Sequence, residues 1–544
     1  MLRLSVPIAA LVVSIALTTA AGAVPKTPSS AGYDINEKSV AVLQADLASG
    51  RVTAEDLTAA YLARIKAIDS SGVSLRSVIA LNPRAMDEAR AVDANRRAGK
   101  VGGPLDGIPV LIKDNIESDD GTATTAGSEA LLSNVTHRNA PLVQRLRDAG
   151  AIILGKTNLS EWANIRSSHS ISGWSAVGGL VKNPYALDRN ACGSSSGTGA
   201  AVAASLAAVG IGTETDGSVT CPAAMNGLVG LKPTVGLVPR TYIVPISHSQ
   251  DTAGPMGRTV ADVAALLNVI AGTDPRDAAT KSADKYKRDY VTQLSGASLK
   301  GKRLGVLRFA TGFSPAVDAV FERAVALLKE QGAQIVELKS FKPDARLGDA
   351  EQTVLLSELK VDLNAYLAST PPDVKSRTLR DVIAFNRAHP RELSLFGQDQ
   401  FEKADATKGL DDPTYTKAHQ LSLRLTRTAG IDKLVVDNNL DALIAPSYGA
   451  AWRTDVVDGD NDSGSVSSLP AVAGYPHLTV PMGYVTGLPV GISFIGRAWT
   501  EQQLLNVGAA YERASHVRHA PEFTPSVETS EPVSPLLAPL QPTR

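Results

Sequence analysis

The sequence predicts an α/β fold: one domain built on a central mixed β-sheet, with helices on both faces and an α-hairpin at the N-terminal end. Two strand–helix–strand repeats indicate this fold, one over 108–154 and one over 304–338. Strands joined by a helix normally pair in parallel within one sheet. A third observation is the apolar run 442–445, which indicates a buried strand that returns to the sheet after a long helical stretch.

The N-terminal α-hairpin is predicted from spacing and capping signals. Val40, Leu43 and Leu47 recur at helical spacing, and the pattern stops at Gly50. A capping pattern at 53–56 then starts a second helix, which has its own apolar face.

Each strand–helix–strand repeat is marked by its own signals. In the first, residues 108–112 form a strand with Lys113 at its end, Pro141 begins a helix that stops at Gly150, and 151–154 form the next strand. In the second, strands at 304–307 and 335–338 flank a helix at 315–330.

The 544 residues divide into three segments. Residues 1–23 match a secretory signal, with a basic start, an apolar run too short to span a membrane and a small-residue cleavage site, so we expect a secreted or periplasmic protein. Residues 24–520 form the domain. Its part 274–433 is rich in charge and helix, is set off by no linker, and is expected to shape the substrate site. The proline-rich tail 521–544 is expected to be poorly ordered.

Charge patterning excludes several classes of partner. The formal net charge is −1, from 54 basic and 55 acidic residues with no long block of one sign. Nothing here would draw the protein to nucleic acid or to an anionic membrane, and no stable membrane insertion is expected once the signal is removed. The oligomeric state stays open.

Two cysteines, Cys192 and Cys221, are too few for a disulfide framework, and neither has the spacing of metal ligands. A single bridge is compatible with export, but we expect both thiols to be reduced.

Three segments carry the candidate chemistry. Lys113 follows a predicted buried strand, Ser194 lies in the glycine-rich turn 192–199 (CGSSSGTG), and Ser218 ends the segment 213–218 (TETDGS). A serine hydroxyl attacks a carbonyl group only when a base removes its proton, and a buried lysine that has lost its charge can be that base. The expected helix 199–208 and strand 209–213 would return Ser218 to the neighbourhood of Ser194.

Two other interpretations of the glycine-rich turn are weaker. The segment also fits the G-x-S-x-G elbow of α/β-hydrolases with Ser195 as nucleophile, and His248 or His477 as base. An elbow serine directly follows a buried strand, however, whereas the residues before Cys192 are polar and include a proline. A phosphate-binding loop would need a Gly-Lys-Ser ending or a G-x-G-x-x-G pattern, and neither is present.

Together the three segments resemble the amidase signature family, whose serine, serine and lysine hydrolyse carboxamides. The similarity runs from about Ala41 to Tyr511 and includes the segments 155–162, 229–234, 250–256 and 487–491. The resemblance implies that Ser218 is the nucleophile, that Ser194 relays the proton after a cis peptide bond, and that Lys113 is the base. It further implies oxyanion binding by the amides of Thr215, Asp216, Gly217 and Ser218, support from Asp114 and Ser195, and no metal or cofactor.

The sequence departs from the family pattern at several positions inside the signature. Cys192 and Ser196 stand where glycine is common, 214–216 (ETD) replaces the usual Asp-x-Gly, and Thr220 replaces a frequent arginine. These changes spare Lys113, Ser194 and Ser218 but alter the residues around the expected oxyanion site.

A closer resemblance is to the subgroup of bacterial secreted peptide amidases, carried by the segments 171–175, 212–222, 385–389 and 395–398. It implies hydrolysis of the C-terminal carboxamide of peptides with release of ammonia. The alternatives are a general aliphatic or aryl amide hydrolase of the same family, and a secreted binding protein on an amidase scaffold. An amidotransferase subunit that works with tRNA is disfavoured, because no basic surface is apparent.

The substrate is expected to be a small-molecule or peptide amide. Candidate contacts are Trp162, Trp174, His389 and Phe396, each of which has an equal claim to a role in core packing or loop anchoring.

Overall fold

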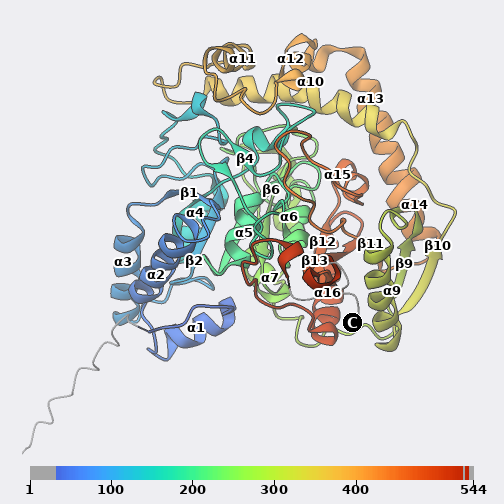
Figure 1. The fold of residues 1–544 in the computed structure, drawn as a ribbon, viewed down its shortest axis with the longest axis horizontal. Helices are drawn as coiled ribbons and strands as arrows, with labels where there is room; N and C mark the ends of the chain where they lie inside the picture. Colours follow the sequence, from blue (N-terminus) through green and yellow to red (C-terminus); the bar gives the residue numbers. More distant parts are fainter. Residues whose placement is uncertain (1–31, 531–532, 538–544) are drawn as a thin grey trace, which may run out of the picture.

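The computed structural model describes residues 32–530 and 533–537. The signal segment 1–23 lies outside the described residues. An 11-stranded mixed sheet runs through the centre of the molecule, in the order β1-β3-β2-β6-β8-β7-β12-β13-β11-β9-β10 (Figure 1). Its strands are β1 (Val78–Leu81), β2 (Pro109–Lys113), β3 (Ile152–Thr157), β6 (Val209–Glu214), β7 (Val229–Lys232), β8 (Thr252–Gly257), β9 (Arg303–Leu307), β10 (Gln334–Leu338), β11 (Ala442–Pro446), β12 (His477–Val485) and β13 (Leu488–Ile495). A separate small pair joins β4 (Trp174–Ser175) and β5 (Gly179–Leu180).

The strand pairing brings the candidate segments to one edge of the sheet. β2 lies parallel to both β3 and β6, with Ile112 opposite Ile211, so β2 and β6 end on the same side. Both strands are buried along their whole length, as expected for a parallel region covered on both faces. Lys113 is the last residue of β2, and the segment that carries Ser218 begins where β6 ends.

Helices cover both faces of the sheet, so the predicted fold class is confirmed. α5 and α6 pack on one face, whereas α7, α9 and α16 pack on the other. The helices are α1 (Val40–Ala48), α2 (Ala54–Arg64), α3 (Ala85–Arg97), α4 (Pro141–Asp148), α5 (Ser196–Ala203), α6 (Thr220–Met225), α7 (Val260–Ile270), α8 (Ala283–Tyr286), α9 (Pro315–Glu330), α10 (Leu347–Ala368), α11 (Leu379–Ala388), α12 (Asp399–Ala406), α13 (Pro413–Thr426), α14 (Asp432–Asp437), α15 (Ser468–Ala473), α16 (Glu501–Ser515) and α17 (Ser534–Leu537). No helix within 32–530 or 533–537 combines the length and the apolar character needed to cross a membrane.

The N-terminal α-hairpin forms as expected from α1 and α2. Thr53 is the N-cap of α2, and its hydroxyl group accepts a hydrogen bond from the backbone N–H of Asp56 at 3.0 Å. Leu57 and Tyr61 on the inner face of α2 are fully buried in the main hydrophobic core. The structure therefore confirms both the helical pattern and the N-cap that the sequence predicts.

The stretch 274–433 has two parts. β9 and β10 are parallel strands at one end of the central sheet, with α9 packed beside them, as the second repeat predicts. From α10 onward the chain leaves the sheet, and α10 to α13 form a layer of their own across the top of Figure 1. This layer has a separate hydrophobic cluster around Leu363, Val382 and Phe401. It covers the edge at which β2 and β6 end, since Tyr366 on α10 accepts a hydrogen bond from Asn134 and Ser247 donates one to Glu358.

The expectation of a poorly ordered tail is wrong for 521–530. Thr524 pairs with Ala186 in a β-bridge, the N–H of Leu187 donates to the Thr524 carbonyl at 2.9 Å, and Val527 is buried against Trp452. Pro521 and Pro525 have no backbone N–H to donate, but the carbonyl of Thr524 and the side chain of Val527 remain available for these contacts.

Candidate active site

Lys113 is a fully buried lysine at the end of β2. Its Nζ lies 2.7 Å from Ser194 Oγ and 2.8 Å from Thr213 Oγ1, with the Thr213 carbonyl at 3.3 Å. Burial lowers the pKa of Lys113 to about 7, against the opposing effect of the nearby carboxyl groups of Asp251 and Glu214. The amine is therefore partly neutral at neutral pH.

Ser194 follows a cis peptide bond from Gly193, which confirms that expectation. The carbonyl of Ser194 accepts a hydrogen bond from the Ser160 N–H at 3.0 Å, which fixes the turn against the segment after β3. A Cβ atom at Gly193 would overlap Ser160 Oγ, so only glycine fits there. The turn thus aims the fully buried Ser194 side chain at Lys113.

Ser218 lies in the short connection between β6 and α6, and the residue is 8% exposed. The N–H of Ser195 donates to the carbonyl of Ser218 at 3.2 Å, so the two serine-bearing turns touch directly. Gly217 precedes Ser218 with φ of 79°, and a Cβ atom there would come within 2.6 Å of Tyr448 Oη. Glycine is thus required by both the backbone angle and the space.

The backbone amides from Thr215 to Ser218 form a set of free donors. None of the four donates a hydrogen bond to an acceptor in the part of the chain that the structure describes, although the carbonyls of Gly217 and Ser218 are both bonded. Thr215 and Asp216 are half-buried and Gly217 and Ser218 are buried, in a protein environment where backbone N–H groups normally find partners. Four in succession beside a serine make an arrangement suited to binding an oxyanion.

Glu214 explains how the connection tolerates its departures from the family pattern. Its Oε2 accepts hydrogen bonds from the N–H groups of Val219 and Thr220, at 2.8 and 2.9 Å, and from Thr220 Oγ1 at 3.2 Å. The carboxyl group therefore caps α6 and holds Thr220 in the position where an arginine is frequent. On the other side of the connection, Thr215 Oγ1 donates to Asp251 Oδ1 at 2.6 Å.

Two other predicted residues support the site without reaching Lys113 Nζ. The Oγ of Ser195 lies 3.1 Å from both the N–H and the carbonyl of Thr213, so it links the glycine-rich turn to β6. Asp114 accepts hydrogen bonds from the N–H and hydroxyl groups of Thr125, and burial raises the pKa of Asp114 to about 6. Ser195 and Asp114 therefore position backbone segments.

The two cysteines form a disulfide, so the expectation of reduced thiols is wrong. Cys192 immediately precedes Gly193, and Cys221 lies in the first turn of α6, with a Cα–Cα distance of 6.0 Å. The number of cysteines excluded a framework but could not exclude one bridge. What decides the pairing is the contact between the two serine turns, which places both cysteines on the same side of the site.

The aromatic residues proposed as substrate contacts are used in packing. Trp162 meets the edge of Phe401 at a centroid distance of 5.7 Å, and Trp174 meets Phe396 at 5.2 Å. The Arg166 guanidinium lies 4.1 Å from the Phe396 ring centroid. His389 stacks on Phe385 at 3.6 Å. The contacts of Trp162, Trp174 and Arg166 join the segment after β3 to the helical layer, whereas the stacking of His389 on Phe385 lies within that layer.

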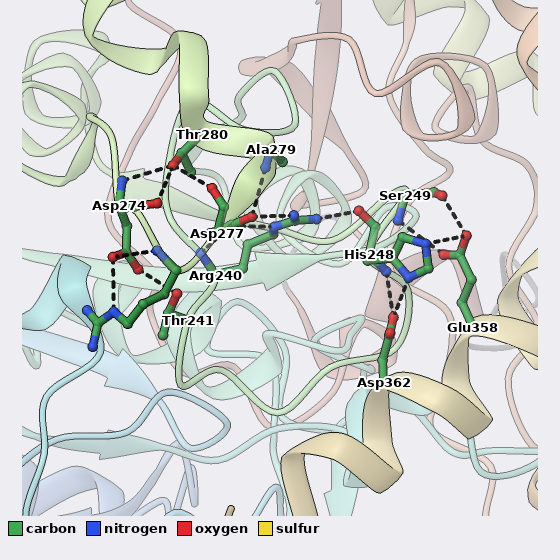
Figure 2. A network of polar contacts seen from close by, with 11 residues as sticks. Arg240, Thr241, His248, Ser249, Asp274, Asp277, Ala279, Thr280, Glu358 and Asp362 are labelled. Atoms are coloured by element: carbon green, nitrogen blue, oxygen red, sulfur yellow. Dashed lines mark hydrogen bonds and ion pairs between the residues drawn. The ribbon is translucent and has the colours of Figure 1, made fainter. Parts of the chain in front are cut away.

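A cavity of about 570 Å³ adjoins the site. At one end it reaches Asn115, Thr213 and Thr215, and the Nδ2 of Asn115 donates to Thr213 Oγ1 at 2.9 Å. Its lining also includes members of the polar network of Figure 2, in which Arg240 contacts Asp277 at 2.7 Å and His248 contacts Asp362 at 2.8 Å. The bond to Asp362 raises the pKa of His248.

Several residues that build the site had no separate prediction from the sequence. Thr213 and Asn115 surround Lys113, and Asp251 with Gln250 holds the connection after β6. Gln250 and Asp251 do lie in the segment 250–256 that carries part of the family resemblance. Their position beside β6 depends on the antiparallel pairing of β6 with β8, which the spacing of residues does not reveal.

The fold and the site define an amidase. The family model described as Amidase matches residues 56–505, and the chain belongs to this family. It is therefore a hydrolase that acts on amide bonds.

The chain is similar to several individual amidases and related proteins. The solved structure of native peptide amidase from Stenotrophomonas maltophilia is 49% identical, with a TM-score of 0.85 over 90% of this chain and 99% of that one. A peptide amidase in complex with the competitive inhibitor chymostatin gives 49% identity and a TM-score of 0.86, over 90% of this chain and 100% of that one. A probable amidase of Arabidopsis thaliana is 38% identical over 94% of this chain and 97% of its own length. A glutamyl-tRNA(Gln) amidotransferase subunit of Chloroflexus aurantiacus is 35% identical over 88% of this chain and 97% of its own length.

Proposed function

We propose that the protein removes ammonia from the C-terminal carboxamide of peptides, through an acyl-enzyme on Ser218. The observation that carries the proposal is the 2.7 Å contact between Lys113 Nζ and Ser194 Oγ, made in a buried site beside Ser218 and four free backbone amides. This arrangement supplies a base, a proton relay, a nucleophile and an oxyanion site in one place.

The first half of the reaction forms the acyl-enzyme. Ser218 Oγ attacks the carboxamide carbon while its proton passes to Ser194 Oγ, and the proton of Ser194 passes to neutral Lys113 Nζ. The carbonyl oxygen becomes an oxyanion that accepts hydrogen bonds from the amides of 215–218. The proton returns along the same path to the leaving nitrogen, the C–N bond breaks and ammonia departs.

Water completes the cycle in the second half. It attacks the ester carbon of acyl-Ser218, and its proton again moves through Ser194 to Lys113. Collapse of the second tetrahedral intermediate releases the carboxylic acid and returns the proton to Ser218. The proposed role of Lys113 thus requires the uncharged amine at the start of each half.

Peptide carboxamides are favoured as substrates by two considerations. The solved structures named peptide amidase share 49% of residues with this chain, whereas the amidotransferase subunit of Chloroflexus aurantiacus shares 35%. In addition, Ser218 is only 8% exposed beneath the helical layer. A –CONH2 end can reach such a serine, but an internal peptide bond needs room for chain on both sides.

The substrate proposal is tested on a peptide amide, its free acid, its N-methylamide and a simple aliphatic amide. The released amine is measured: ammonia from the primary amides and methylamine from the N-methylamide. We expect fast release from the peptide amide, none from the free acid, much slower turnover of the N-methylamide and no internal cleavage by mass spectrometry. Rapid hydrolysis of the aliphatic amide without hydrolysis of the peptide amide would overturn the peptide assignment. Internal cleavage at a comparable rate would overturn the idea of a closed site.

The pH dependence of turnover tests the proposed base. Because burial lowers the pKa of Lys113 to about 7, kcat/KM should rise with pH on the acid side, with its midpoint at about pH 7. Below this pKa the protonated amine cannot accept the proton of Ser194, so the rate should fall about tenfold per pH unit. A rate independent of pH on the acid side would contradict a lysine base.

We also propose that the protein acts outside the cytoplasm. Support comes from the signal-like pattern in 1–23 and from the bridge between Cys192 and Cys221, since disulfides persist mainly in oxidising compartments.

A further inference from the structure

The backbone and the carboxyl group of Asp216 have different surroundings. Its backbone N–H belongs to the four free amides, whereas its carboxyl group lies on the other side of the connection. There Asp216 Oδ2 accepts a hydrogen bond from Ser468 Oγ at 2.6 Å, at the start of α15. The second oxygen, Oδ1, is buried and receives no hydrogen bond from an N–H or hydroxyl group of the described residues. An acceptor buried in this way needs a donor.

Two groups beside the Asp216 carboxyl can supply a donor: the hydroxyl of Ser467, just before α15, and the carboxyl group of Glu351 when it is protonated. Glu351 lies on α10 and is 8% exposed, so it is the one that connects Asp216 to the helical layer. Its Oε1 accepts from Gln250 Nε2 at 2.9 Å, and the same Nε2 lies 3.4 Å from the carbonyl oxygen of Thr215. Glu351 is therefore linked to the connection after β6 in two ways: through the carboxyl group of Asp216, and through Gln250, which bridges it to Thr215.

Two carboxyl groups in contact cannot both be ionised in a buried place, because their charges repel at short range. Burial and the neighbouring Asp216 raise the pKa of Glu351 well above its ordinary value. The other ionisable groups that face Asp216 are Glu214 on β6, Lys232 on β7 and Tyr448 after β11, while α15 contributes only serine hydroxyls. Burial also raises the pKa of Asp216, but the hydroxyl groups of Ser467 and Ser468 and the charge of Lys232 favour its ionised form. The shared proton is therefore placed on Glu351.

We propose that Asp216 and Glu351 share one proton, and that this bond from α10 positions the oxyanion-binding amides of the connection after β6. Both are positioning residues for amide hydrolysis at Ser218, so the inference rests on the proposed function. When the proton is lost, two negative charges face each other and the connection moves away from α10. The helical layer thereby controls the oxyanion site, and turnover falls on the alkaline side of the pH profile.

The test compares pH profiles of variants that keep or break the bond. In Glu351→Gln the side-chain amide still donates to Asp216 but does not titrate. We therefore expect kcat near neutral pH within about threefold of wild type. The fall of kcat at high pH, which we call the alkaline limb, should be lost. In Glu351→Leu the bond is broken, and kcat should fall about 10- to 100-fold with a smaller change in KM, because misplaced oxyanion donors weaken the transition state more than the ground state. Asp216→Asn serves as a second variant if Glu351→Leu fails to fold, and it too should lose the alkaline limb.

Glu358→Gln is the matched control. Glu358 is buried on the same helix, but it bonds to Ser247, Ser249 and Tyr415 and not to the connection after β6. The fall of kcat at high pH in Glu358→Gln should equal that of wild type. The rise of kcat on the acid side should be the same in every variant. An alkaline limb unchanged in both Glu351→Gln and Asp216→Asn, or absent from the wild type, would overturn the inference.

The profiles are measured on whichever carboxamide the protein hydrolyses fastest. Failure of the peptide assignment therefore leaves this test intact. Loss of the Ser218 mechanism is detected separately by the Ser218→Ala variant.

Discussion

Replacing Ser218 with alanine is expected to lower kcat for carboxamide hydrolysis by at least about 10⁴-fold, with the melting temperature nearly unchanged. The oxygen that would form the ester is lost, while the structural contacts of this residue are made by its backbone, whose carbonyl accepts from Ser195. The side chain itself makes none of the hydrogen bonds that hold the two turns together. Turnover is measured as ammonia release, and folding by thermal unfolding.

Ser195→Ala is the control for this experiment. Ser195 occupies the nucleophile position of the alternative α/β-hydrolase interpretation, but its Oγ is engaged with the N–H and carbonyl of Thr213. We expect a small loss of stability and a modest loss of kcat from this variant. If Ser195→Ala abolished turnover and Ser218→Ala retained it, the roles assigned to the two serines would have to be exchanged.

Lys113→Met is expected to lower kcat by about 10²- to 10⁴-fold, the usual contribution of a general base. Methionine is shorter and uncharged, so it removes the base without placing a charge in the buried site. The native structure should be retained, since a buried lysine costs desolvation energy in the wild-type protein. Circular dichroism and thermal unfolding check the fold, and steady-state ammonia release gives the rate.

Lys156→Met provides the comparison. Lys156 is also fully buried, on the neighbouring strand β3, and burial also lowers its pKa, but its Nζ bonds to the carbonyl of Ile116 and to Thr124 Oγ1. Its replacement should affect stability more than kcat. Equal losses of kcat in the two variants would indicate that a buried lysine matters here for structure alone.

Much of the fold could be predicted from the sequence because local signals and tertiary packing agree. The helix α9 begins at Pro315 and ends at Glu330 as expected, and β2 delivers Lys113 at its last residue. α5 differs, beginning at Ser196 and ending at Ala203, earlier than the expected 199–208. Its small residues carry little periodic signal, because they are buried on all sides.

The surroundings of the site were less predictable, because they depend on contacts between distant segments. The sequence marks Glu214 only as a departure from the family pattern, and it predicts a role for Asp216 only through its backbone amide. The partners of their carboxyl groups come from α6, α10 and α15. The disulfide depends in the same way on contact between the two serine turns. Such pairings follow from the assembled fold, and no spacing within one segment encodes them.

The bridge between Cys192 and Cys221 spans 29 residues and encloses Ser194, α5, β6 and Ser218 in one covalent ring. Closing a ring of this size stabilises the folded state by about 3.6 kcal/mol in the chain-entropy model, by restricting the unfolded chain. A peptide bond broken once inside the ring leaves both hydroxyl groups on the same molecule until the bridge is reduced. While the bridge is intact, the ring also limits the distance between the two serines in the unfolded protein. Folding therefore starts with the two serine turns already close together.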